Sequence, residues 1–271
     1  MTNKPKVILV TGTSRGIGKA SADKLTQQGH IVYGCSRYQE GLTDRHLQLD
    51  VTDYEACLAA INRIVSVEGR IDAIVNNVGY HLMGASEETS IEEIRDQFEV
   101  NFFGSLNVIK AATSHLVNQR SGHIINITSL PARVALPFMS AYCASKYALE
   151  GYSRSLRAEL LPFGVYVANV VPGAVDVGTT DYSVKVTATP SGIFEPLRRD
   201  ITEVVRTGQH EDVTSVTELV DTIANIMSNP TPAFTNLLGK AANEFIYADK
   251  YLPEESVEAM IRSFIGLPET I

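Results

Sequence analysis

The chain has 271 residues, of which 44% are hydrophobic and 20% charged, which is the composition of an ordinary soluble globular protein. A formal net charge of -8 excludes a dominant basic face, so we expect neither a nucleic acid nor a membrane as partner. Three cysteines without CxxC spacing disfavour a disulfide framework or a zinc site, and no signal peptide or membrane span is evident, so we expect a cytoplasmic protein without a bound metal.

Short apolar runs rich in β-branched residues alternate with helical patterns, which indicates βαβ units. The expected strands are Lys6–Thr11, His30–Ser36, His46–Asp50, Ile71–Asn76, Gly122–Thr128, Val165–Val171 and Ala233–Leu238. The helices expected between them are Gly16–Gln28, Asp53–Glu68, Ile91–Val117 and Ala141–Leu161. This order predicts an α/β fold with a Rossmann-like, doubly wound parallel sheet of about seven strands and helices on both faces.

The regular alternation stops after Pro172. The segment Gly173–Gly192 is rich in Gly, Thr, Ser and Asp and predicts a loop. This composition also predicts that Gly173–Gly192 is a mobile lid.

Helical patterns resume near the C-terminus. They cover Glu195–Thr207, Thr217–Met227 and a final region of about 240–266. The amphipathic stretch Pro253–Phe264 is expected to close the core or to contact another subunit, because its polar face is too acidic for a membrane surface. With no internal repeat or linker, residues 1–271 are predicted to form one domain.

A glycine-rich turn, Thr11–Gly18, follows the first strand directly. Such a turn lets backbone N–H groups approach a pyrophosphate at the start of a helix. The rival P-loop pattern fails, because Ile17 stands in place of its second glycine and Ala20 follows Lys19. A structural turn without any ligand stays open from this segment alone.

The spacing G-x-x-x-G-x-G in this turn resembles the short-chain dehydrogenase/reductase family. Other motifs of that family follow in order from Lys6 to about Gly173. They are Leu49-Asp50-Val51, Asn76-Asn77-Val78-Gly79 with Val for the usual Ala, Val100-Asn101, Thr128-Ser129, Tyr142-Cys143-Ala144-Ser145-Lys146 and Pro172-Gly173. The later segment Leu238–Ala242 and the tail weakly resemble 17β-hydroxysteroid dehydrogenase-like members.

The resemblance implies a nicotinamide cofactor. Its expected binding residues are Gly12, Ser14, Arg15, Gly16, Ile17, Gly18, Ser36, Arg37, Asp50, Val51, Asn77, Gly79, Tyr142, Lys146, Pro172, Gly173 and Val175. An acid that would select NAD is absent at Ser36, and Arg37 and Arg15 can pair with a 2′-phosphate, so NADP(H) is predicted over NAD. Asp176 stands where the family often places a lid Thr, with Thr179 and Thr180 further on, so a family-type lid contact is in doubt.

The resemblance also implies four catalytic residues. Tyr142 is expected to transfer the proton, and Lys146, one helical turn later, to lower the pKa of its phenol. Ser129 would hydrogen-bond the substrate oxygen. Asn101 would orient a water that links Lys146 to solvent. Cys143 and His123 are expected to be structural, and His81 to lie near the pocket without a catalytic role.

We therefore predict an oxidoreductase that transfers a hydride between NADP(H) and a hydrophobic ketone or secondary alcohol, acting as a homodimer or homotetramer. The resemblance implies that the region of about 173–212 forms the substrate pocket and lid. Apolar pocket candidates, which can equally be core residues, are Phe138, Met139, Tyr182, Ile193, Phe194 and Leu197. Two alternatives are a non-catalytic NADP(H)-binding redox regulator and a nucleotide-sugar epimerase or dehydratase. The regulator would not need a Tyr142–Lys146 pair, so the presence of this pair argues against it. The epimerase needs a longer C-terminal part and a differently spaced glycine turn.

Overall fold

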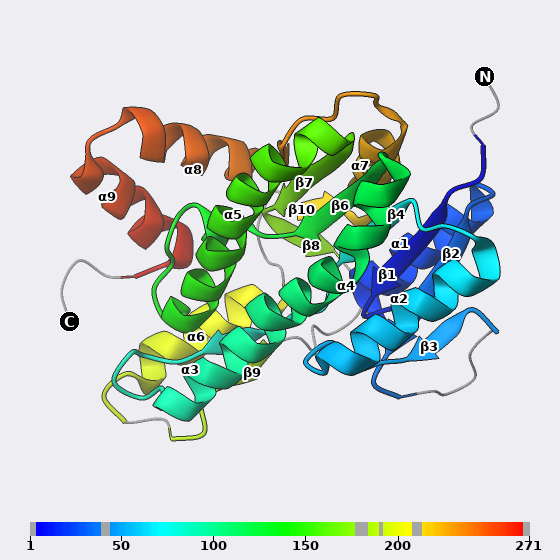
Figure 1. Ribbon diagram of the computed structural model, residues 1–271. Helices are drawn as coiled ribbons and strands as arrows, with labels where there is room; N and C mark the ends of the chain where they lie inside the picture. The colour runs from blue at the N-terminus through cyan, green and yellow to red at the C-terminus, as the bar shows by residue number, and fades with distance from the viewer. Residues whose placement is uncertain (1–3, 39–43, 177–183, 190–191, 208–212, 268–271) are drawn as a thin grey trace.

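The computed structural model of the chain describes residues 4–38, 44–176, 184–189, 192–207 and 213–267 (Figure 1). Its centre is a seven-stranded parallel sheet in the order β11-β7-β6-β4-β1-β2-β3. The strands are β1 (Val7–Thr11), β2 (Ile31–Ser36), β3 (His46–Gln48), β4 (Ala73–Asn76), β6 (Gly122–Ile127), β7 (Val165–Pro172) and β11 (Thr235–Leu238). The order reverses between β1 and β4, as in a doubly wound sheet, so the predicted fold class is confirmed.

Helices cover both faces of this sheet. One face carries α1 (Gly16–Gln27) and α7 (Val216–Ser228), and the other carries α2 (Tyr54–Glu68), α4 (Gly104–Gln119) and α5 (Ser140–Leu160). Each layer buries its own hydrophobic cluster against the strands. Within the described residues, no helix is both long enough and apolar enough to cross a membrane.

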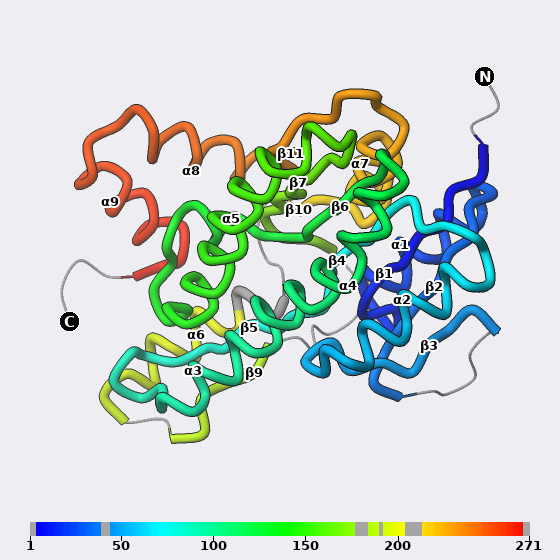
Figure 2. The backbone as a smooth tube through the Cα atoms, in the orientation of Figure 1, coloured from blue at the N-terminus to red at the C-terminus, as the bar shows by residue number. Residues whose placement is uncertain are grey.

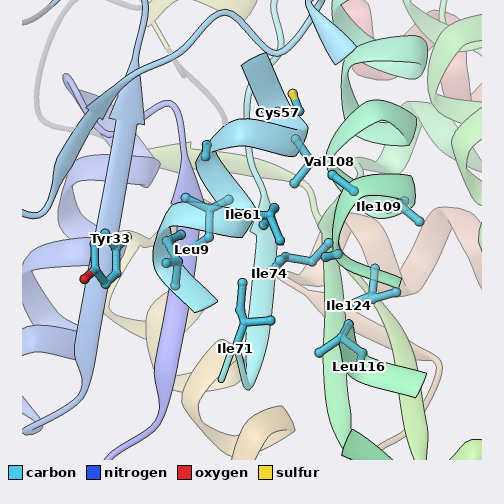
Figure 3. Close-up of a cluster of buried hydrophobic side chains, with 14 of the residues drawn as sticks. Leu9, Tyr33, Cys57, Ile61, Ile71, Ile74, Val108, Ile109, Leu116 and Ile124 are labelled. Atoms are coloured by element: carbon cyan, nitrogen blue, oxygen red, sulfur yellow. The ribbon is translucent and has the colours of Figure 1, made fainter. Parts of the chain in front are cut away.

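Alternate residues of β1 and of β4 enter opposite clusters. Leu9 of β1 and Ile74 of β4 pack beneath Ile61 of α2 (Figure 3), with Ile109 of α4 in the same cluster. The neighbouring Ile8 lies in the cluster under α1 and α7. Because both faces are buried, the strands need apolar residues at nearly every position, which explains the continuous apolar runs that predicted them.

Two short strands lie inside the predicted loop Gly173–Gly192. β8 (Ala174–Asp176) pairs with β10 (Val213–Ser215), and β9 (Val184–Val186) pairs with β5 (His81–Met83). The loop prediction is therefore wrong at these two places. Each strand has three residues and depends on a partner far away in the sequence, so no local alternation signals it.

The predicted continuous helix Ile91–Val117 is interrupted, so that prediction is wrong in its middle. α3 (Ile91–Phe98) runs into a π-helical turn, Glu99–Phe103, before α4 begins. A π turn holds one more residue per hydrogen-bonded ring than an α-helix, and such turns are frequent at functional sites. Here the turn carries Asn101 with its side chain fully buried.

The last two helices, α8 (Lys240–Tyr251) and α9 (Glu254–Ile265), lie at the left of Figure 1, on the opposite side of the molecule from β3. Val257 and Ile265 of α9 are buried, and the rings of Phe264 and Phe245 meet edge-on with centroids 5.0 Å apart. The amphipathic tail therefore closes hydrophobic clusters of the same chain, as one of its two predicted roles requires.

A buried ion pair holds α6 (Glu195–Thr207) to the segment that follows β5. Arg198 Nε lies 3.3 Å from Glu88 Oε2, and both side chains are at most 8% exposed. After β9, the Thr187 hydroxyl donates to the Glu88 carbonyl, and the Ala188 N–H donates to Glu93 at 2.7 Å. These contacts gather β5, β9, α3 and α6 at one end of the molecule (Figure 2).

A second buried network joins the end of β6 to α5. The 3-10 helix Leu130–Ala132 follows β6, and the next residue, Arg133, forms an ion pair with Glu150 of α5. Glu150 also accepts a 2.6 Å hydrogen bond from Asn169 of β7. Since Glu150 lies one turn after Lys146, this network fixes that helix against the carboxyl end of β6.

This network predicts a coupled response to mutation. Glu150→Leu leaves the Arg133 guanidinium partly buried without its carboxylate and should lower the free energy of unfolding by about 3 kcal/mol. Arg133→Met combined with Glu150→Leu removes both charges and should cost less than Glu150→Leu alone. Urea unfolding of these two variants, of Arg133→Met alone and of wild type measures the cycle. Strictly additive losses would show that the two groups are not coupled.

Candidate active site

The glycine turn connects β1 to α1 at the carboxyl edge of the sheet. The N–H groups of Gly12 and Thr13 donate to the Cys35 carbonyl of β2 at 2.9 and 3.0 Å, which fixes the turn beside that strand. Helix α1 begins after Arg15, whose side chain makes no capping hydrogen bond to the helix. The first backbone N–H groups of a helix lack partners within it and attract anions.

Gly18 shows how tightly the turn is closed. A β-carbon at this position would lie 2.2 Å from the Gly12 carbonyl oxygen, so any other residue would push the two backbones apart. The turn therefore brings backbone, without side chains, to the start of α1. Ile17 packs into the core cluster, whereas Ser14 and Arg15 are exposed. The predicted pyrophosphate site requires such an approach of bare backbone.

Asn77 and Thr11 lock the glycine turn to β4. Asn77 Nδ2 donates to the Thr11 carbonyl at 2.9 Å, and the Thr11 hydroxyl accepts from the backbone N–H of Asn77 at 2.9 Å. Both residues lie where the sheet order reverses between β1 and β4. Asn77, a predicted cofactor-binding residue, thus fixes the position of the glycine turn against the end of β4.

Asn101, on the π turn, holds the segment that follows Gly79. Its Oδ1 accepts from the Tyr80 N–H at 3.0 Å, and its Nδ2 donates to the Tyr80 carbonyl at 3.0 Å. Gln97, one turn earlier, accepts from the Leu82 N–H at 2.9 Å. Two buried amides therefore fix residues 80–82 on both sides of His81.

Tyr142 and Lys146 lie in the first two turns of α5, and both are buried, at 3% and 5% exposure. The Lys146 ammonium lies 5.9 Å from the centre of the Tyr142 ring and donates to the Ile127 carbonyl at 2.9 Å. Burial lowers the pKa of Lys146 to about 8. The structure thus places a buried amine beside the phenol, as the sequence predicts.

The four predicted catalytic residues share one neighbourhood. Asn101 Nδ2 lies 3.3 Å from the hydroxyl of Ser145, which in turn donates to the Tyr142 carbonyl at 2.7 Å. A β-carbon at Gly79 would lie 3.6 Å from Lys146 Nζ, so the backbone of this glycine lies next to the amine. Ser129, 8% exposed, follows β6 two residues after the Ile127 carbonyl that binds Lys146.

An apolar cluster surrounds Tyr142. It joins β5, the segment before α5, β9, α6 and α9, and its buried members are Met83, Leu136, Met139, Tyr142, Cys143, Val184, Ile201 and Ile265. Phe138, a predicted pocket residue, packs against it, and its ring lies 6.4 Å from that of Phe194. Ile193, in contrast, is 80% exposed. The phenol of Tyr142 therefore lies in apolar surroundings.

His81 lies closer to Tyr142 than the sequence suggests. Its ring centre is 4.2 Å from that of Tyr142, with the planes tilted by 46°. The sequence places His81 near the pocket only, whereas the structure places it against the phenol ring. Cys143, next along the helix, points into the core and contacts the Leu136 backbone, as expected of a packing residue.

The predicted cofactor-selecting residues lie at the edge formed by β2 and β3. Arg37 and Arg15 are both exposed, and Ser36 ends β2. Asp50 lies two residues beyond β3, which ends at Gln48 and is shorter than predicted, and its carboxylate accepts from the Thr52 N–H at 3.0 Å. Asp50 and the buried Val51 after it therefore form a fixed turn at this edge.

Pro172 ends β7, and Gly173 N–H donates to the Leu238 carbonyl of β11 at 3.1 Å. Val175 lies in β8 opposite Thr214, so strand pairing holds its backbone. Asp176 ends the same strand and is exposed. The predicted lid residues Thr179 and Thr180 and the pocket residue Tyr182 lie outside the described residues.

Comparison with known proteins identifies the family. A sequence model described as short chain dehydrogenase matches residues 6–188. The chain belongs to the short-chain dehydrogenase/reductase family. It is therefore an oxidoreductase of a family that uses nicotinamide cofactors and acts on small molecules.

Similar proteins agree over nearly the whole length. A 3-ketodihydrosphingosine reductase from Bacteroides thetaiotaomicron is 33% identical, covering 97% of this chain and 99% of its own. A short-chain dehydrogenase from Streptomyces avermitilis superposes with a TM-score of 0.83 at 28% identity, covering 98% of each chain. Another, from Burkholderia cenocepacia in complex with NADP, gives a TM-score of 0.77 at 28% identity, covering 96% of this chain and 99% of that one.

Several residues that shape this short-chain dehydrogenase/reductase site escaped the sequence analysis. Gln97 lies one turn before Asn101 and Glu150 one turn after Lys146, and this i, i+4 spacing was a signal that could have found both. Arg133 and His46 carry no such local signal, because their partners are more than ten positions away or on another strand.

The burial of Lys146 predicts a conflict between stability and function. Below pH 8 the folded protein carries a buried ammonium, a penalty on the order of 3 kcal/mol relative to a neutral amine. Lys146→Met should therefore unfold at higher denaturant concentration than wild type at pH 7, even after losing the hydrogen bond to Ile127. The pKa is lower in the folded chain, so wild type should gain stability between pH 8 and about 10.5.

Urea unfolding of both proteins at pH 7, 9 and 10.5 measures this difference. The gap in unfolding free energy should be largest at pH 7 and shrink as the pH rises. A gap that does not change with pH would mean that Lys146 is not forced to carry its charge in the folded interior.

Proposed function

We propose that this protein is an NADP(H)-dependent oxidoreductase that interconverts a hydrophobic ketone and its secondary alcohol. The observation that supports this most is the Tyr142–Lys146 pair, in which a buried amine with a pKa near 8 lies 5.9 Å from a phenol ring. A buried cation favours ionisation of a nearby phenol, so that Tyr142 can exchange a proton near neutral pH.

The described residues fit a dinucleotide. The backbone of Gly12, Ser14, Arg15, Gly16, Ile17 and Gly18 would hold its pyrophosphate at the start of α1. Ser36, Arg37 and Arg15 would bind the 2′-phosphate, and Asp50 with Val51 the adenine. Asn77 and Gly79 would line the path to the nicotinamide, and Pro172, Gly173 and Val175 would contact its carboxamide side. When bound, the nicotinamide supplies or accepts the hydride.

The protein's own groups would handle the proton and the charge. In the reducing direction Ser129 donates a hydrogen bond to the substrate oxygen, and the Tyr142 hydroxyl gives that oxygen its proton. Lys146 stabilises the phenolate that remains. One of its three N–H donors serves the Ile127 carbonyl, and the others would bind the ribose hydroxyls. Asn101 would guide a water that returns the proton.

A long-chain ketone is the substrate class to test first. The apolar cluster around Tyr142 draws on five separate segments, including the C-terminal helix α9, so the phenol lies among apolar side chains. The Bacteroides relative, 33% identical over 97% of this chain, carries the name of a reductase of a long-chain keto base. We therefore propose 3-ketodihydrosphingosine and simpler long-chain 3-ketones as first substrates.

Removing the Tyr142 hydroxyl tests the reaction. Tyr142→Phe should lower kcat for NADPH-dependent ketone reduction by about 100-fold or more, because general acid catalysis contributes on that scale. Tyr152→Phe, the same deletion on a different face of α5, serves as the matched control and should keep activity within a few-fold. Undiminished activity in Tyr142→Phe would contradict the assignment.

Reversing one charge tests the cofactor. Arg37→Asp should lower kcat/KM with NADPH by about 10- to 100-fold, because a charge-assisted pair with the 2′-phosphate becomes a repulsion. The value with NADH should change by less than about threefold. Arg95→Asp, on the exposed face of α3, is the control. Preference for NADH in wild type would refute the NADP(H) proposal.

A further inference from the structure

His46 lies directly behind the residue that would choose between the two cofactors. It begins β3 and is 8% exposed. Its Nε2 is 2.9 Å from the Ser36 hydroxyl oxygen, and its Nδ1 is 3.5 Å from that of Thr13. One imidazole ring therefore joins the end of β2 to the glycine turn.

The hydrogen bonds of Ser36 identify the donor in the contact between His46 and Ser36. The Ser36 hydroxyl lies 2.7 Å from the Tyr38 carbonyl, which can only accept, so its single hydrogen points there. His46 Nε2 must then carry a hydrogen and donate it to Ser36. Burial lowers the pKa of His46, which keeps the ring neutral near pH 7 and leaves Nδ1 as an acceptor 3.5 Å from the Thr13 hydroxyl, which also lies 3.4 Å from the Cys35 carbonyl.

The close packing around this ring involves Gly34. Gly34 is the register partner of His46 on β2, and a β-carbon there would lie 2.4 Å from the Thr13 hydroxyl and 3.3 Å from His46 Nδ1. A side chain at position 34 would separate the ring from the glycine turn. The glycine thus lets Thr13, His46 and Ser36 form one hydrogen-bonded cluster.

We propose that His46 is a positioning residue for NADP(H) selectivity, holding the Ser36 oxygen so that its hydrogen can turn from the Tyr38 carbonyl to a 2′-phosphate. This inference rests on the proposed NADP(H) dependence. A phosphate oxygen is a charged acceptor and forms a stronger hydrogen bond than a carbonyl, so the hydroxyl gains by turning. NADH carries only a hydroxyl at that place and gains less from a fixed Ser36.

Two substitutions test the two nitrogen atoms of the His46 ring separately. His46→Gln places an amide nitrogen near the position of Nε2, so it can still donate to Ser36. His46→Asn places its amide near Nδ1, keeps the Thr13 side and does not reach Ser36. Calorimetric titration of each variant with NADPH and with NADH gives dissociation constants without any need for turnover.

Loss of the Ser36 contact should weaken NADPH binding. We expect His46→Asn to raise the NADPH dissociation constant about tenfold, the scale of one hydrogen bond to a charged group, with the NADH constant changed less than threefold. His46→Gln should stay within about threefold of wild type for both cofactors. Adding Ser36→Ala to His46→Asn should not weaken NADPH binding further, because both substitutions remove the same hydrogen bond from a fixed Ser36 to the 2′-phosphate.

The outcomes separate this inference from the proposed function. The inference is overturned if His46→Asn weakens the binding of both cofactors equally, or weakens neither. The proposed function stays intact in that case, as long as wild type binds NADPH selectively. Equal affinity of wild type for both cofactors would overturn the NADP(H) proposal and the inference with it. If His46→Asn does not fold, His46→Met fills the ring's volume without a donor and gives the same test.

Discussion

The site depends on one costly feature, a lysine amine held in the interior. Lys146 loses most of its hydration, which lowers its pKa to about 8, and the Ile127 carbonyl offers only partial compensation. A buried charge of this kind is tolerated where the rest of the fold is stable enough to offset its cost. Here the sheet, α5 and the Arg133–Glu150 network supply that strength, and the charge they enclose faces the Tyr142 ring.

The rest of the site consists largely of backbone fixed by side chains. Asn101 and Gln97 hold residues 80–82, and Asn77 with Thr11 holds the glycine turn. These amides have a structural role, because each one links two elements that are far apart in the sequence. The parallel sheet makes this possible, because its strands all end at the same edge, where loops from distant positions meet.

The sequence predicted the sheet and the grouping of Ser129, Tyr142, Lys146 and Asn101, because continuous apolar runs and ordered motifs are local signals. It did not predict the π turn that turns Asn101 inward, since one inserted residue leaves the hydrophobic period almost unchanged. It missed β5, β8, β9 and β10, which exist only through their partners. It also missed the contact of His81 with the Tyr142 ring and that of His46 with Ser36, because both contacts cross between elements.

The central claim is that the Lys146 charge makes the Tyr142 phenol ionise at an unusually low pH. An ultraviolet pH titration of phenolate absorbance, taken as wild type minus Tyr142→Phe in saturating NADP⁺, measures that ionisation directly. The account predicts one phenol that titrates at least about one pH unit below the ordinary value of about 10. A difference titration centred at about 10 or above would contradict it.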